Sequence, residues 1–196
     1  MSRKPVKTRA AGSPKGNSRN KLVIGIVLVA FFALIGLIFV SGKEPAGIEG
    51  VVEFPRPAQG HDDTHDHTDD DHSDLPPVGG IHSSAWQNCG IYDQPIEVGN
   101  AAHSMEHGAV WIAYQPDLDA DSVASLQDRV RGTTYLILSP YPGLKSPVVM
   151  TAWGLQLELD SADDKRIDQF IDRYRSGPQT PERGASCVDG VGQPLS

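Results

Sequence analysis

The sequence predicts one small α+β domain, of β-α-β-β-α order with a loop-rich lead-in, that follows a single transmembrane helix. Three observations support this fold class. A run of residues near the amino terminus is apolar and uncharged, a later hexapeptide is apolar on both faces, and two further segments place apolar residues at helical spacing. A chain of 196 residues has room for one domain of ordinary size.

The predicted anchor is the run LVIGIVLVAFFALIGLIFV at residues 22–40. At a rise of about 1.5 Å per residue, a helix of this length roughly matches the ~30 Å hydrocarbon core of a bilayer. A cleaved signal peptide would have a shorter apolar core and a small-residue cleavage site, and the VSGKEP that follows is a poor match to such a site. The run therefore predicts an uncleaved transmembrane helix.

The distribution of charge predicts the orientation of this anchor. Residues 1–21 contain seven basic residues and no acidic one, which predicts a disordered cytoplasmic tail and places residues 41–196 outside the cell membrane. The outer part carries a net charge of about −15, which repels nucleic acid. The predicted partners are therefore the lipid bilayer and another envelope protein, with no nucleic acid.

Residues 41–77 are rich in proline, histidine and aspartate and predict a flexible stalk. Neutral imidazole is a good ligand for Cu²⁺ and Zn²⁺, and neighbouring carboxylates raise the local cation concentration. Two interpretations stay open for this segment, a solvated acidic spacer and a weak metal collector. The histidines of the second interpretation are His61, His65, His67 and His72.

The folded domain is expected at residues 78–190, with residues 191–196 as a tail. AVWIAY at 109–114 predicts a central strand that is covered on both faces. Residues 119–132 predict an amphipathic helix. TTYLIL at 133–138 predicts the next strand, and residues 147–159 predict a strand that bends at Gly154. The last helix is indicated by apolar residues at i, i+3, i+4 and i+7, namely Ile167, Phe170, Ile171 and Tyr174.

The two cysteines, Cys89 and Cys187, fall on the oxidising side of the predicted membrane. An even pair in a small extracytoplasmic domain predicts a disulfide. The bridge would join residues 98 positions apart, for which the chain-entropy relation gives about 4 to 5 kcal/mol of stabilisation. It would also remove Cys89 as the free thiolate that a Cys-His nucleophile needs.

The segment HSMEH at residues 103–107 matches the H-x-x-E-H pattern of inverted zinc peptidases, in which two histidines bind zinc and the glutamate activates water. That chemistry needs the motif inside a helix, so that both histidines share a face. Gly108 and then a predicted strand follow at once, and no third ligand is evident. We therefore expect no helix here, and we assign no catalytic residue.

A simpler metal site remains open if HSMEH forms a single helical turn or a tight loop. His103 and His107 would then be the primary ligands, with His82 and Met105 as further ones. Imidazole with thioether favours copper, whereas imidazole with carboxylate favours zinc. The alternative is a non-catalytic scaffold, in which the histidines bind backbone groups and Glu106 caps a loop.

The outer part contains a series of ordered motifs: CGIY at 89–92, HSMEHGAVWIAY at 103–114, SPYPGL at 139–144, TAWG at 151–154, and Pro181-Glu182 before Cys187. Together they resemble the motifs of a bacterial domain of unknown function, DUF3105. The resemblance implies an envelope protein with one amino-terminal anchor and a short outer domain, and it implies no established activity. The family pattern falls on His82, Cys89, Gly90, Tyr92, His103, Glu106, His107, Gly108, Tyr114, Pro140, Trp153, Gly154 and Cys187.

Overall fold

The computed structural model describes residues 23–24, 26–28, 31, 47–64 and 74–195. The chain divides into two compact units, Met1–Ala46 and Gly47–Ser196. The predicted cytoplasmic tail and most of the predicted transmembrane segment lie outside the described residues, and the described positions between 23 and 31 are helical. Within the described ranges, no helix is both long enough and apolar enough to cross a bilayer.

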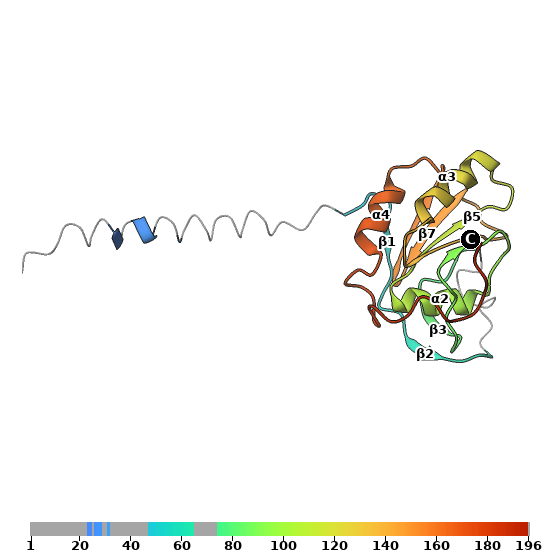
Figure 1. Cartoon of the computed structure of the whole chain (residues 1–196), viewed down its shortest axis with the longest axis horizontal. Helices are drawn as coiled ribbons and strands as arrows, with labels where there is room; N and C mark the ends of the chain where they lie inside the picture. Colours follow the sequence, from blue (N-terminus) through green and yellow to red (C-terminus); the bar gives the residue numbers. More distant parts are fainter. Residues whose placement is uncertain (1–22, 25, 29–30, 32–46, 65–73, 196) are drawn as a thin grey trace, which may run out of the picture. The chain divides into compact units, whose positions relative to one another are not determined.

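The unit Gly47–Ser196 is built on a six-stranded mixed sheet with the strand order β1-β8-β7-β5-β6-β4 (Figure 1). The central strand β5 pairs in parallel with β6 and antiparallel with β7, and all of the residues of β5 are buried. The prediction of a central strand in AVWIAY is thereby confirmed. The strands are β1 (Val52–Glu53), β4 (Gly90–Ile91), β5 (Val110–Tyr114), β6 (Leu136–Pro140), β7 (Val148–Ala152) and β8 (Leu155–Leu159).

Helices cover both faces of this sheet. Successive side chains of a strand point to opposite faces, so neighbouring residues of one strand belong to different cores. Val110 and Ile112 belong to the core on the side of α3 (Ala120–Val130) and α4 (Arg166–Tyr174). Trp111 and Ala113 belong to a second core, to which α2 (Val98–His107) contributes three buried residues, Ala101, Ala102 and Met105. The domain therefore has three layers, with α2 on one face and α3 and α4 on the other (Figure 1).

The expectation that HSMEH lies outside a helix is wrong, since it forms the last turns of α2. Gly108 does not exclude the helix but ends it, with a left-handed φ of 118° and its N–H bonded to the carbonyl of Met105. A Cβ at this position would lie 3.0 Å from the Cα of Ser176, so the close approach of the chain also requires glycine.

The segment 147–159 forms a hairpin of two strands, and not the single bent strand that the sequence predicts. Ala152 pairs directly with Leu155, which leaves Trp153 and Gly154 as a two-residue turn. Gly154 is the second central residue of this turn and has a φ of 73°, a positive value of the kind that a type II turn requires at that position. The order from AVWIAY onward is thus β-α-β-β-β-α, within the α+β class that the sequence predicts.

The folded unit begins at Gly47, and not near residue 78, so the described parts of the predicted stalk belong to the domain. β1 pairs with β8 in the main sheet, and β2 (Gln59–His61) pairs in parallel with β3 (Gly80–His82) in a second sheet. Backbone hydrogen bonds hold these short strands, and such pairing leaves little hydrophobic signal in the sequence. The stalk histidines His65, His67 and His72 lie outside the described residues.

The carboxy-terminal segment returns to the start of the domain through the predicted disulfide. Cys89 and Cys187 are bonded, with their Cα atoms 5.4 Å apart, and the Cys89 N–H also donates to the Cys187 carbonyl. Beyond the bridge, Val191 and Leu195 form single β-bridges to residues of the lead-in. The predicted tail is therefore hydrogen-bonded to the domain as far as Leu195.

Candidate metal centre

Two buried histidines on different elements have their rings fixed in the same way. On β3, His82 is fully buried and its Nδ1 lies 2.8 Å from the Gly80 carbonyl. On α2, His103 is 5% exposed and its Nδ1 lies 2.8 Å from the Ser83 carbonyl. A carbonyl only accepts, so each Nδ1 carries the proton and the lone pair of each neutral ring is on Nε2. Metal-binding histidines are oriented by such bonds.

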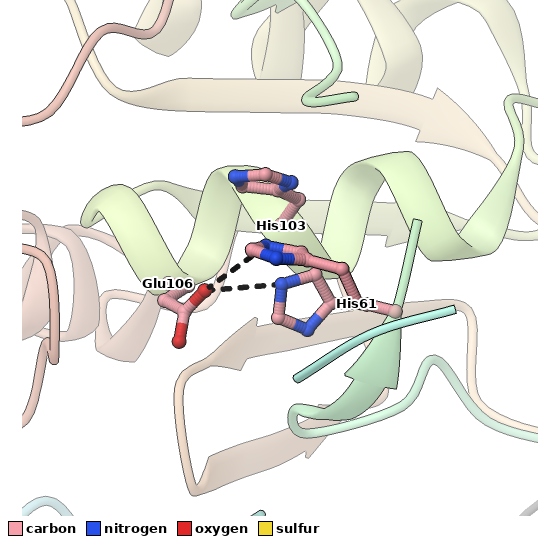
Figure 2. Close-up of side chains that lie close together, drawn as sticks. His61, His103 and Glu106 are labelled. Atoms are coloured by element: carbon pink, nitrogen blue, oxygen red, sulfur yellow. Dashed lines mark ion pairs between the residues drawn. The ribbon is translucent and has the colours of Figure 1, made fainter. Parts of the chain in front are cut away.

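Glu106 and His61 complete a group of four side chains around these two rings (Figure 2). Glu106 is three residues after His103, so both lie on one face of α2, and it is 3% exposed. One of its oxygens, Oε2, lies 3.0 Å from Nε2 of His82 and 4.0 Å from Nε2 of His61. The pairing of β2 with β3 places the third ring, that of His61, at the site, because His61 is the direct partner of His82 in these two strands.

The dimensions of this group fit a single metal ion. One ligand atom from each of the four residues lies within 4.8 Å of all the others, and the centroids of the three imidazole rings are 4.7 to 4.9 Å apart. Two adjacent ligands with bonds of about 2.0 to 2.2 Å to one ion lie about 3 Å apart. The pair formed by His82 and Glu106 already has this spacing, so only modest movement of the other rings is needed.

The electrostatics of the group favour a cation. Burial, with a smaller effect of the neighbouring rings of His107, His82 and His61, lowers the pKa of His103 to about 4, against the hydrogen bond to Ser83, which raises it. This ring is therefore neutral at neutral pH. Among the described residues, the ion pairs of Glu106 involve only histidines. A buried carboxylate without a cationic partner is costly.

The contact between His82 and Glu106 does not behave as a satisfied hydrogen bond. Although the two atoms are 3.0 Å apart, Nε2 of His82 is buried without a partner in acceptable hydrogen-bond geometry. Two acceptors, an imidazole lone pair and a carboxylate oxygen, thus face one another in a buried position. A divalent cation between them would bind both, which is the arrangement that a metal centre provides.

The structure brings together two of the four metal ligands that the sequence predicts. His82 and His103 belong to the group, but His107 does not. Its Nδ1 is bonded to the Ser186 carbonyl, and its Nε2 lies 3.6 Å from the carboxylate of Glu182, so the carboxy-terminal segment holds it. Sequence reasoning gave Glu106 no ligand role and His61 only a weak one in the stalk.

Met105 is not a ligand of the group, because it is fully buried in the apolar core that contains Trp111. It precedes Glu106 by one position, and adjacent residues of a helix point about 100° apart. The thioether that the sequence offers therefore stabilises the packing of α2 on the sheet.

A cavity of about 570 Å³ lies beside the disulfide, between the carboxy-terminal segment and the end of α3. None of the four members of the histidine and glutamate group lines it. Its walls include the disulfide itself, Ile91, Tyr135 and Leu195, and are mostly apolar. Nothing in the sequence predicted it, because its walls come from segments far apart along the chain.

Fold and site define a small, disulfide-bonded α+β domain with a His₃Glu group that can hold a metal ion and of which three members are buried. Residues 65–189 match the family described as protein of unknown function (DUF3105). The chain belongs to this family, as its motifs predicted. The matched segment includes His82, His103 and Glu106, whereas His61 precedes it. Neither a curated protein nor a solved structure matches the chain.

Proposed function

We propose that this chain is a metal-binding protein of the cell envelope, tethered to the membrane, whose outer domain binds one divalent cation through His61, His82, His103 and Glu106. The observation that supports it is the convergence of four ligand atoms to within 4.8 Å of one another, from elements that are separate in sequence. Buried polar atoms of folded proteins are usually hydrogen-bonded, so the unpaired Nε2 of His82 beside the buried carboxylate of Glu106 also supports a ligand role.

The ligand set favours zinc. It consists of imidazole and carboxylate, and the thioether of Met105 is excluded because its side chain lies in the apolar core. Soft thioether ligands select Cu(I), whereas imidazole with carboxylate suits Zn²⁺ and, as the second choice, Cu²⁺. We therefore place Zn²⁺ first.

The proposed membrane location rests on the sequence and on the disulfide. The apolar run at residues 22–40 and the basic residues before it support an anchor with its amino terminus in the cytoplasm. A disulfide persists in oxidising surroundings, which supports an extracytoplasmic position for the domain. The ion would then come from outside the cell membrane.

The test is a zinc titration of the purified full-length chain, by calorimetry and by elemental analysis after dialysis. We expect one Zn²⁺ per chain, and we expect His103→Gln to abolish stoichiometric binding. The matched control is His107→Gln. This residue is on the same helix, is equally buried at 4% exposure, and is likewise bonded to a backbone carbonyl through Nδ1.

The outcomes separate three interpretations. Loss of zinc in the His103 variant alone supports the proposal. Loss in both variants favours the H-x-x-E-H arrangement, in which His103 and His107 are the ligands. No binding by the wild-type chain refutes the proposal.

A specific observation favours one alternative, a scaffold with structural histidines. The three rings of His82, His103 and His107 each bond a backbone carbonyl, and the bonds of His103 and His107 join segments of the domain that are far apart in sequence. In that case His103→Gln and His107→Gln would both lower the free energy of unfolding by a similar amount, and the content of metal would stay at zero in every variant.

A further inference from the structure

The four members of the metal-binding group differ sharply in exposure. The residues His82, His103 and Glu106 are 0%, 5% and 3% exposed. In contrast, the side chain of His61 is 46% exposed. One ligand of the four is therefore open to solvent, and the other three are enclosed by the domain.

The four also differ in how firmly the fold holds them. The rings of His82 and His103 are each fixed by a bond from Nδ1 to a carbonyl, and α2 is fixed by its packing on the sheet. His61 makes no such bond within the part of the chain that the structure describes. It ends β2, a strand of three residues that is exposed or half-buried and is paired with β3 alone among the described strands.

The distances agree with this division. Nε2 of His82 and Oε2 of Glu106 are 3.0 Å apart, which is the spacing of adjacent ligands on one ion. Nε2 of His61 is 4.0 Å from the same oxygen. His61 must move toward the group to become an adjacent ligand, and an exposed side chain on a short edge strand is free to make or to reverse that movement.

We propose that His61 is an exchangeable ligand, and that the ion held by His82, His103 and Glu106 binds a small external anion at the position that His61 leaves. This inference rests on the proposed function, because it needs an ion in the group. Two imidazoles, one carboxylate and an open fourth position form a ligand set that reactive zinc sites use, whereas four fixed protein ligands are typical of structural sites.

The charge of the site specifies the class of external ligand. A divalent ion with one carboxylate and neutral imidazoles carries a net charge of +1 in a largely buried place. A monoanion with a small oxygen or nitrogen donor neutralises this charge, which water or neutral imidazole does not. In the exchange, the bond from the metal to Nε2 of His61 breaks and a bond from the metal to the anion forms. His61 leaves as a neutral ring, and no electron is transferred.

The experiment uses the full-length chain loaded with Co²⁺ in place of Zn²⁺, so that visible absorption reports the coordination, and azide as the anion. Four proteins are compared: wild type, His61→Ala, Gln59→Ala and His82→Gln. The Gln59 variant alters the same short strand without removing a ligand, and the His82 variant removes a buried ligand.

We expect His61→Ala to keep one Co²⁺ per chain with an affinity lowered by about 10- to 100-fold. It should bind azide at least about 10-fold more tightly than the wild type, and added imidazole should compete with azide. The Gln59 variant should behave as the wild type, and the His82 variant should lose the Co²⁺ spectrum.

Two results would overturn the inference while the proposed function stands. The first is loss of Co²⁺ from the His61 variant that is as complete as from the His82 variant, since His61 would then be a permanent ligand. The second is azide binding that is equal in the wild type and the His61 variant, or absent from both. Failure of the wild type to bind Co²⁺ or Zn²⁺ refutes the proposed function itself, and this inference with it.

Discussion

Replacing Glu106 by glutamine distinguishes a metal ligand from a structural ion pair, because the two roles predict losses of stability of different size in the metal-free protein. Glutamine has nearly the same shape as glutamate but lacks its charge. Glu106 is 3% exposed, and its ion-pair contacts among the described residues are with histidines alone. If the carboxylate is there to bind an ion, removing its charge costs the metal-free domain little, within about 1 kcal/mol. If it forms a buried pair with a charged His82, breaking that pair costs about 3 to 5 kcal/mol.

The effect on metal binding has a magnitude that can be worked out. Zinc at 100 times its dissociation constant stabilises the folded state by about 2.7 kcal/mol. The folded unit Gly47–Ser196 has about 150 residues, so this raises Tm by about 5 to 11 °C. Loss of the only charged ligand should weaken binding by at least about 100-fold. At the same zinc concentration, the variant would then gain only about 0.4 kcal/mol, or about 1 to 2 °C.

The assay is thermal unfolding with and without zinc, after treatment with a chelator, together with urea unfolding of the metal-free proteins. The control is Glu158→Gln, which removes the same charge from an exposed position on β8. It should keep the full zinc-dependent rise in Tm. A Glu106 variant that keeps this rise, or that loses several kcal/mol without metal, would refute the reasoning.

Three further predictions concern stability. Replacing Cys89 and Cys187 by serine should lower the free energy of unfolding by about 4 to 5 kcal/mol, because the bridge joins residues 98 positions apart, and urea unfolding with and without reductant measures this. In the metal-free protein, the pKa of His103 is about 4 when folded and about 6.5 when unfolded, so the unfolded chain binds more protons between these values. Stability should therefore fall as the pH is lowered from about 6.5 to about 4, and urea unfolding of His103→Gln across this range should show a shallower fall. Gly108→Ala should cost about 1 to 3 kcal/mol through backbone strain and a close contact, whereas Gly143→Ala, which has a φ of 92° but open space around it, should cost less in the same urea assay.

The parts of the fold that the sequence predicts well are those with a regular hydrophobic signal. The strand AVWIAY is apolar on both faces and lies at the centre of the sheet. The helices α3 and α4 bury one face each, so their apolar residues recur at helical spacing. The disulfide follows from the pairing of two cysteines in one small domain.

Helix α2 has no such signal, because it is buried along nearly its whole length and its buried residues are polar as well as apolar. An ordinary amphipathic helix would expose polar residues such as His103, Glu106 and His107 to solvent, whereas in α2 all three are buried. Glu97, at the start of the helix, makes no side-chain cap. The sequence did contain one signal of the end of this helix, because glycine commonly follows the last turn of a helix and Gly108 follows the last turn of α2.

The role of His61 was beyond sequence reasoning for a different reason. Its neighbours are acidic and uncharacteristic of a folded core, so composition indicates a flexible stalk. What places it at the site is the register between β2 and β3, in which His61 is opposite His82. Backbone hydrogen bonds set this register across 21 positions of sequence, and local patterns do not encode such pairing.

The position of Glu106 within its helix gives a further reason to expect a cation at the site. It is the second-last residue of α2, where the helix dipole concentrates negative partial charge and disfavours a carboxylate. The N–H groups of Glu182 and Gly184 bond the carbonyls of Glu106 and His107, which satisfies these acceptors but adds no net positive charge. A buried carboxylate at the negative end of a helix, among imidazoles of which at least His103 is neutral, is stabilised by a bound cation. Metal binding should therefore increase the free energy of unfolding of the domain.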